Sequence, residues 1–185
     1  IVDQVDGAIS KFLSVLNEGS AWTYDPSEVL RSAKNRGIDV KAISDLQSAD
    51  LATLDGLAKS YFSENALMAA VEGGGTGLGG AVLIAADIPL LFGINLRLIQ
   101  QIGAAYGFDV SKPQFGPLVL SIFNVAASGS RESKNDSLRE ITVAAAAVAH
   151  ASDYKGRVSG TFRDQNRHLP REIAKNIGGR KIAQL

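Results

Sequence analysis

A cluster of glycines at residues 73–80 contains the first residues whose spacing could do chemistry. Gly75, Gly77 and Gly80 have the GxGxxG spacing of loops that bind the pyrophosphate of a dinucleotide. Such a loop needs a strand before it and an acidic residue about 20 residues after it. Here a helical pattern precedes the glycines, and the later region carries Arg97 where the acid would stand. A nucleotide-binding enzyme is therefore only a distant alternative.

The same glycines fit a role in helix packing. Gly73 and Gly77 are four residues apart, as are Gly75 and Gly79, which is the small-xxx-small spacing that lets two helix backbones approach closely. We expect these four residues and Gly80 to form a close helix contact or a tight turn between helices. We favour this role over the nucleotide loop because the strand and the acid are missing.

Other catalytic or metal-binding residues are sparse. The chain has no Cys, no GxSxG nucleophile motif, and two His, His150 and His168. A zinc site formed by these two residues and Asp153 would lack the compact ligand spacing of known zinc sites. We therefore expect no catalytic residue, no cofactor and no metal, and we predict that the protein is not an enzyme.

The elements that position these residues are helices. Apolar residues recur at helical spacing along the 185 residues, with almost no strand pattern, which predicts an all-α single domain over residues 1–185. Its expected parts are helices within residues 1–70, a core at 71–128 that contains a glycine-rich apolar helical hairpin, and an alanine-rich helix with a basic tail at 137–185. Because the chain lacks an initiator Met and stops in mid-pattern, we expect a piece of a longer protein.

Cap signals predict where the helices begin and end. Asp25 is expected to cap a short helix that has Pro26 in its first turn and ends at Gly37. The next helix should bury Leu51, Leu54, Ala58, Tyr61, Phe62 and Met68 on one face and end where the glycines begin. Its start and two later starts are expected at Ser44 with Gln47, at Asp87 with Pro89, and at Ser137 with Glu140. Another helix has a possible capping box at Ser111 with Gln114, and Pro117 could either kink this helix or begin it.

The charge of the chain is divided by position. Residues 1–150 hold eleven Lys and Arg against sixteen Asp and Glu, whereas residues 151–185 hold eight against three. A tail with a net charge of +5 could attract an anionic surface through Arg157, Arg163, Arg167 and Arg171, although a solvated helix face that pairs with acids elsewhere is an alternative. Nucleic acid is not an expected partner, because the tail has only two aromatic residues for base stacking.

The centre of the chain is apolar, with four charged residues between Gly73 and Ala127. Its uncharged stretches are interrupted by Gly and Pro and do not make a spanning helix of about 20 apolar residues. A buried core or a hairpin that dips into a membrane fits better. We expect Asp87 to cap a helix and Arg97 to reach the surface or pair with an acid, or the two to form a polar contact inside an apolar site.

Residues 75–109 strongly resemble the signature of the EcsC protein family. They contain a glycine cluster, an apolar run, Asp87 two residues before Pro89, an apolar helix with Arg97, and the sequence Tyr106-Gly107-x-Asp109. The resemblance implies a bacterial protein on the cytoplasmic side of a membrane, associated with transport or protein export. It implies no agreed catalytic residues.

Two functional hypotheses follow. The first is a cytoplasmic, peripheral membrane protein that docks on a membrane surface or a membrane protein complex through apolar helices and the basic tail. The second is a helical binding protein for a lipid or another hydrophobic small molecule, oriented by Asp87 and Arg97. Tyr106 and Asp109 are further candidates for ligand or partner contact, and either hypothesis is compatible with a homo-oligomer.

Overall fold

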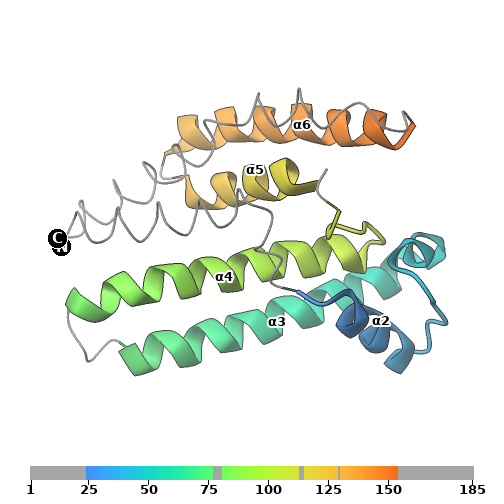
Figure 1. The fold of residues 1–185 in the computed structure, drawn as a ribbon, viewed down its shortest axis with the longest axis horizontal. Helices are drawn as coiled ribbons and strands as arrows, with labels where there is room; N and C mark the ends of the chain where they lie inside the picture. The colour runs from blue at the N-terminus through green and yellow to red at the C-terminus, as the bar shows by residue number, and fades with distance from the viewer. Residues whose placement is uncertain (1–23, 77–80, 113–114, 129, 154–185) are drawn as a thin grey trace. The chain divides into compact units, whose positions relative to one another are not determined.

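The computed structural model describes residues 24–76, 81–112, 115–128 and 130–153, and these residues form helices and connecting turns with no strand (Figure 1). The all-α prediction is therefore confirmed for this part of the chain. The chain divides into two compact units, one at residues 20–111 and one that contains the described residues from Lys112 onward. The elements in chain order are α2 (Pro26–Asn35), the 3₁₀ helix η1 (Ile43–Ser48), α3 (Leu51–Thr76), α4 (Ala81–Ala105), α5 (Gly116–Ala127) and α6 (Arg131–Asp153).

The first unit is organised around α3 and α4, which lie side by side in antiparallel directions (Figure 1). The short elements α2 and η1 contact this pair. Each contributes fully buried apolar side chains, including Val29 from α2 and Leu46 from η1. The burial of these side chains supplies the main force that holds short helices in place, because helices of this length are marginal on their own.

Helix α2 begins and ends as predicted. Asp25 Oδ1 accepts a hydrogen bond from the Ser27 backbone N–H at 2.8 Å, and Pro26 is the first residue of the helix. At the other end Gly37 has a φ of +81°, and the Ile38 N–H donates to the Ala33 carbonyl at 3.1 Å. This is the Schellman arrangement, which favours glycine because a side chain is strained at positive φ.

The predicted cap at Ser44 and Gln47 is wrong, because these residues lie inside η1 and not at the start of α3. The Asp45 carboxylate caps η1, since its Oδ2 accepts from the backbone N–H groups of Lys41 and Ala42. Helix α3 instead starts after Asp50, whose Oδ1 accepts from the Thr53 N–H at 2.9 Å. Several Ser and Asp residues crowd this stretch, and only the one whose carboxylate reaches a free N–H becomes the cap.

The buried face of α3 differs in part from the predicted one. Leu54, Ala58 and Tyr61 are buried as expected, together with Leu57 and Asn65. In contrast, Leu51, Phe62 and Met68 are 66%, 60% and 39% exposed. The buried residues recur every three or four positions, which is the period of one helix face. Phe62 falls off that face, whereas Met68 lies on it but beyond Asn65, the last buried residue in the described part of α3.

The expected helix boundaries at the glycines and at Asp87 are also wrong. Helix α3 continues through Gly73 and Gly75 to Thr76, and α4 runs without interruption through Asp87 and Pro89. A proline inside a helix removes one backbone hydrogen bond and does not by itself end the helix. Helix α4 lies lengthwise beside α3, and this packing supports α4 at Asp87 and Pro89 (Figure 1).

Helix α4 ends at Ala105, two residues before Gly107. Gly107 has a φ of +85°, and the Phe108 N–H donates to the Gly103 carbonyl at 3.0 Å. Its backbone also lies close to η1: the Gly107 carbonyl accepts from Gln47 Nε2 at 3.0 Å, and a Cβ at Gly107 would lie 2.8 Å from the Gln47 backbone N. Glycine is therefore required here for both conformation and space.

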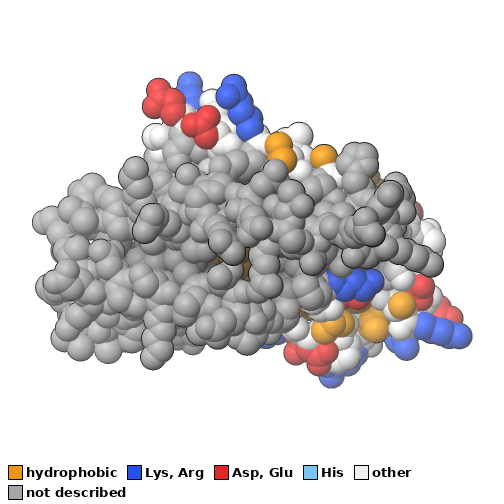
Figure 2. All heavy atoms as spheres, turned by 45° about the horizontal axis from the view of Figure 1, so that its top comes forward, with side chains coloured by type: hydrophobic (Ala, Val, Ile, Leu, Met, Phe, Trp, Pro, Cys, Tyr) orange, Lys and Arg blue, Asp and Glu red, His pale blue; other side chains and the backbone are white. Residues whose placement is uncertain are grey.

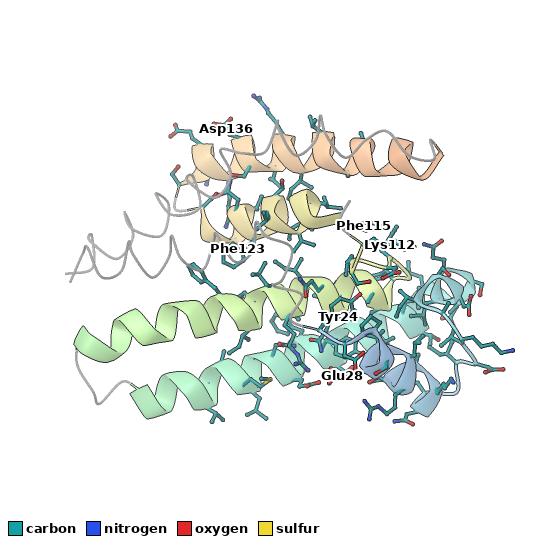
Figure 3. The ribbon with its side chains drawn as sticks, viewed as in Figure 1. Tyr24, Glu28, Lys112, Phe115, Phe123 and Asp136 are labelled. Carbon is teal, nitrogen blue, oxygen red and sulfur yellow. The ribbon has the colours of Figure 1, made fainter. Side chains whose placement is uncertain are left out.

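In the second unit α5 and α6 lie side by side and antiparallel (Figure 1). Figure 3 labels Phe115 and Phe123 at α5, and both are buried. The helix starts at Gly116 with Pro117 in its first turn, which agrees with the alternative that Pro117 begins the helix and not with a start at Ser111. The expected cap at Ser137 is wrong, because α6 already begins at Arg131.

Ser137 instead lies one to two turns into α6 and is 5% exposed. Its hydroxyl accepts from Asn124 Nδ2 at 3.1 Å and lies 3.2 Å from Ser128 Oγ, so it joins α6 to the end of α5. Sequence alone suggested a cap because Ser occurs both at helix N-caps and inside helices. Only the contact of Ser137 with α5 distinguishes these two roles.

Candidate functional site

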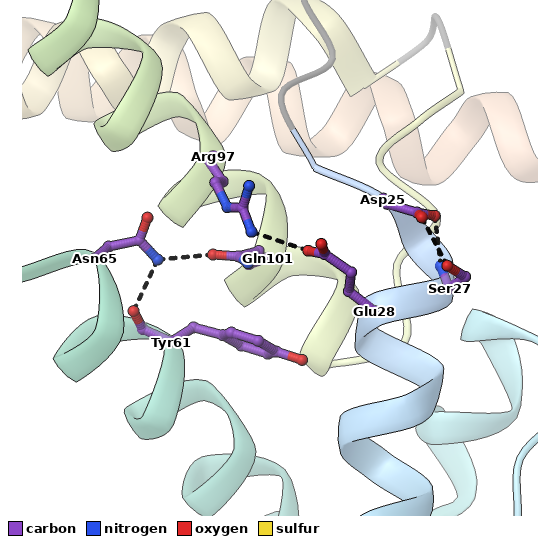
Figure 4. A network of polar contacts seen from close by, with 7 residues as sticks. All are labelled: Asp25, Ser27, Glu28, Tyr61, Asn65, Arg97 and Gln101. Atoms are coloured by element: carbon purple, nitrogen blue, oxygen red, sulfur yellow. Dashed lines mark hydrogen bonds and ion pairs between the residues drawn. The ribbon is translucent and has the colours of Figure 1, made fainter. Parts of the chain in front are cut away.

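A buried polar cluster lies within the apolar helices of the first unit, and we define it as Glu28, Tyr61, Asn65, Arg97 and Gln101 (Figure 4). Asn65 on α3 and Gln101 on α4 are each 1% exposed. Asn65 Nδ2 donates to Gln101 Oε1 at 2.7 Å and to the Tyr61 carbonyl at 2.8 Å. Because buried amides without partners are costly, these bonds fix the register of α3 against α4.

Arg97 joins the same cluster to α2. Its Nη2 lies 2.9 Å from Glu28 Oε2, and the two side chains are 26% and 38% exposed. Figure 3 shows Glu28 on α2. Glu28 lies in the first turn of this helix, because the N-cap residue Asp25 comes three positions earlier. Thus Arg97 pairs with an acid, as one of the two sequence interpretations expected. At this exposure the pair contributes roughly 0–1 kcal/mol to stability, so its main effect is to orient the guanidinium.

Three buried polar atoms of the cluster have no hydrogen-bond partner: Tyr61 Oη, Asn65 Oδ1 and Arg97 Nε. Burial raises the pKa of Tyr61 above its ordinary value, and the nearby Ser32 partly offsets this effect without reaching hydrogen-bond geometry. Asn65 Oδ1 is an acceptor and Arg97 Nε–H is a donor.

Tyr106 and Asp109, the two further candidates for ligand or partner contact, each bond to another side chain of the chain. The Tyr106 hydroxyl donates to Asp55 Oδ1 on α3, and this bond raises the pKa of Tyr106. Asp109 accepts from the hydroxyl of Ser111 at 2.5 Å. Burial of the Tyr24 side chain and, to a smaller extent, the negative charge of Asp109 raise the pKa of Tyr24 to about 12. Neither residue belongs to the polar cluster, so the structure does not bring the four predicted contact residues to one place.

The remaining predicted sites are described in part or not at all. Asp87 lies within α4 and Gly73 and Gly75 lie within α3, but the side chain of Asp87 is outside the described residues. Also outside them are Gly77, Gly79, Gly80, Arg157, Arg163, Arg167 and Arg171. Within the described part of the chain, no helix is long and apolar enough to cross a membrane, and no group of three or more acidic, His or Cys side chains is placed to hold a metal ion.

Sequence reasoning missed Asn65, Gln101 and the role of Glu28 as the partner of Arg97. A signal for Asn65 was present, since it follows Tyr61 by four residues on the buried stripe of α3, where a polar residue needs an explanation. No comparable signal linked Glu28 to Arg97, because they are 69 positions apart in the chain.

Gly73 and Gly75 on α3 and Arg97 on α4 lie in one antiparallel pair of helices, and Tyr106 and Gly107 directly follow the end of α4 (Figure 1). The model of the EcsC protein family matches residues 1–185. The chain belongs to the EcsC family. No solved structure matches the chain.

Two curated relatives from Bacillus subtilis (strain 168) are similar to parts of this EcsC-family chain. Protein EcsC is 37% identical over 84 residues, which is 45% of this chain and 36% of the relative. Uncharacterized protein YdbA is 36% identical over 69 residues, which is 37% of this chain and 25% of the relative. The aligned part thus spans a quarter of the length of YdbA and a little more than a third of the length of EcsC.

Proposed function

We propose that this EcsC-family protein is a membrane-associated accessory or interaction protein without enzymatic activity, related to transport or protein export. It docks on a membrane surface, or on a protein complex in the membrane, through apolar helices and the basic segment at residues 151–185. Membership of the EcsC family supports the part of the proposal that rests on the resemblance to this family.

The observation that carries the proposal is the exposure of apolar side chains on α3. Leu67 and Val71 are 67% and 68% exposed on the same side of the helix. Neighbouring exposed apolar residues of this size are costly in water and are typical of surfaces that contact a partner or a membrane. By contrast, acidic and basic side chains lie next to one another on the visible face of the described residues (Figure 2).

Cosedimentation of the full-length protein with liposomes tests this proposal. We expect binding to vesicles that contain anionic lipid, with one part lost at high salt and another part retained. Replacing Arg157, Arg163, Arg167 and Arg171 with Gln should remove the salt-sensitive part, since each basic residue near an anionic surface contributes about 1 kcal/mol that salt screens. A protein that stays in the supernatant with neutral and anionic vesicles at low salt would contradict the proposal.

A second candidate is a binding protein for a lipid or another hydrophobic small molecule. The unpaired Asn65 Oδ1 and Arg97 Nε favour it, because they offer an acceptor and a donor inside an apolar pair of helices. Native mass spectrometry of the full-length protein distinguishes the two candidates: a copurified lipid that is lost in Asn65→Leu would support the second.

A further inference from the structure

The surface of α3 changes character at Asn65. Between Leu54 and Asn65 most of its exposed positions are polar, namely Asp55, Lys59, Ser63 and Glu64, with Phe62 as the exception. From residue 66 to residue 71 every position is apolar, and five of the six are exposed: Ala66, Leu67, Met68, Ala70 and Val71. We call residues 66–71 the apolar sleeve.

The apolar sleeve covers more of the helix circumference than a single groove in a partner protein would contact. At 100° per residue, its five exposed positions are spread over about 200° of the helix circumference. A groove in a partner protein covers one side of a helix, whereas acyl chains surround every side that protein does not cover. A helix that is apolar over nearly all of its free circumference is typical of a hydrocarbon environment.

The polar cluster holds the apolar sleeve in a fixed position. Asn65, the residue just before the sleeve, is bonded to Gln101 on α4, and Arg97 on α4 is paired with Glu28 on α2. These contacts link α3 to α4 and α4 to α2 at the point where α3 becomes apolar (Figure 4). The sleeve is therefore presented on a rigid pair of helices and need not fold on contact with a partner.

We propose that the apolar sleeve is the segment that enters the membrane, and that it enters only to the depth where headgroups meet acyl chains. Six helical residues extend about 9 Å along the axis, which is far shorter than the roughly 30 Å hydrocarbon core of a bilayer. Glu72 follows directly, and an ionised carboxylate opposes deeper insertion. This inference rests on the proposed membrane association and names the segment and lipid region involved.

Two matched tryptophan variants test the proposal. The chain has one Trp, Trp22, which is first replaced by Phe. In this background Leu67→Trp reports on the sleeve and Leu51→Trp is the control, because both leucines belong to α3 and are 67% and 66% exposed. The full-length variants are mixed with phosphatidylcholine vesicles containing phosphatidylglycerol, with and without lipids brominated near the headgroup end of the acyl chains.

We expect the emission of the Leu67→Trp variant to shift to shorter wavelength with vesicles and to be quenched by brominated lipid, while the Leu51→Trp variant shows neither effect. In the native background, Leu67→Ser combined with Val71→Ser should lower vesicle partitioning roughly tenfold or more, and Leu51→Ser should leave it unchanged. Circular dichroism checks that each variant is folded.

Three outcomes would overturn the proposal, and they can be told apart. If the protein cosediments but the Trp at position 67 is not quenched, the sleeve is not the inserted segment although the proposed membrane association stands. If no variant cosediments, the proposed function fails as well. If the emission at position 67 shifts without vesicles and depends on protein concentration, the sleeve binds a second copy of the chain.

Discussion

Replacing Gly107 with Ala probes the contact between the end of α4 and η1. Gly107 has a φ of +85°, and for a residue with a side chain this conformation costs about 1–2 kcal/mol. The added Cβ would also collide with Gln47, where the backbone N lies 2.8 Å away. Moving Gln47 away would weaken its hydrogen bond to the Gly107 carbonyl, which is worth about 1 kcal/mol. The expected loss in the free energy of unfolding is therefore about 2–4 kcal/mol.

Gly37 provides the matched control for this substitution. It belongs to the same compact unit and has a φ of +81°, but a Cβ there would meet nothing within 4 Å. Gly37→Ala should therefore cost only the conformational part, about 1–2 kcal/mol. Urea unfolding followed by circular dichroism should show a lower midpoint for Gly107→Ala than for Gly37→Ala. With a slope of about 2 kcal/mol per M, the gap would be roughly 0.5–1 M. Equal midpoints would refute the close approach of η1 to the end of α4.

Two further predictions concern buried and capping polar groups. Asn65→Ala should lower the free energy of unfolding by about 2–3 kcal/mol because it leaves Gln101 buried without its partner. In the same urea assay, the double variant Asn65→Leu with Gln101→Leu should lose less of this free energy. A larger loss in the double variant would contradict this prediction. Hydrogen bonds from backbone and side-chain donors lower the pKa of Asp25, Asp45 and Asp50 in the folded protein. The stability that these three carboxylates contribute is therefore present above their unfolded pKa of 3.8, and it is lost as the pH falls through their lower folded pKa values. Melting temperatures should therefore fall below about pH 4, and Asp50→Asn, which retains a capping oxygen but does not titrate, should reduce that fall; an unchanged acid dependence would argue against this cap.

Local sequence signals were sufficient where a helix is defined by its own residues. The N-cap at Asp25, the proline that follows it and the glycine at position 37 interact only with neighbours in the chain, and the prediction of α2 was correct. The end of α4 at Gly107 was predictable for the same reason, because a residue at positive φ favours glycine wherever it occurs. The period of apolar residues likewise determined the all-α class.

Tertiary contacts decided everything that depends on distant partners. Pro89 and the start of the glycines at Gly73 predicted breaks because their local preferences oppose a helix, yet α3 continues through Gly73 and Gly75 and α4 continues through Pro89. Ser44 and Ser137 have the residue type of a cap, but each lies inside a helix, since η1 begins at Ile43 and α6 begins at Arg131. The partner of Arg97 lies 69 positions away on α2, a distance over which no local pattern operates. Sequence by itself therefore determined the type of structure and several helix ends, whereas the packing of α2, α3 and α4 decided which polar groups meet and which apolar residues remain exposed, because burial and pairing depend on the whole fold.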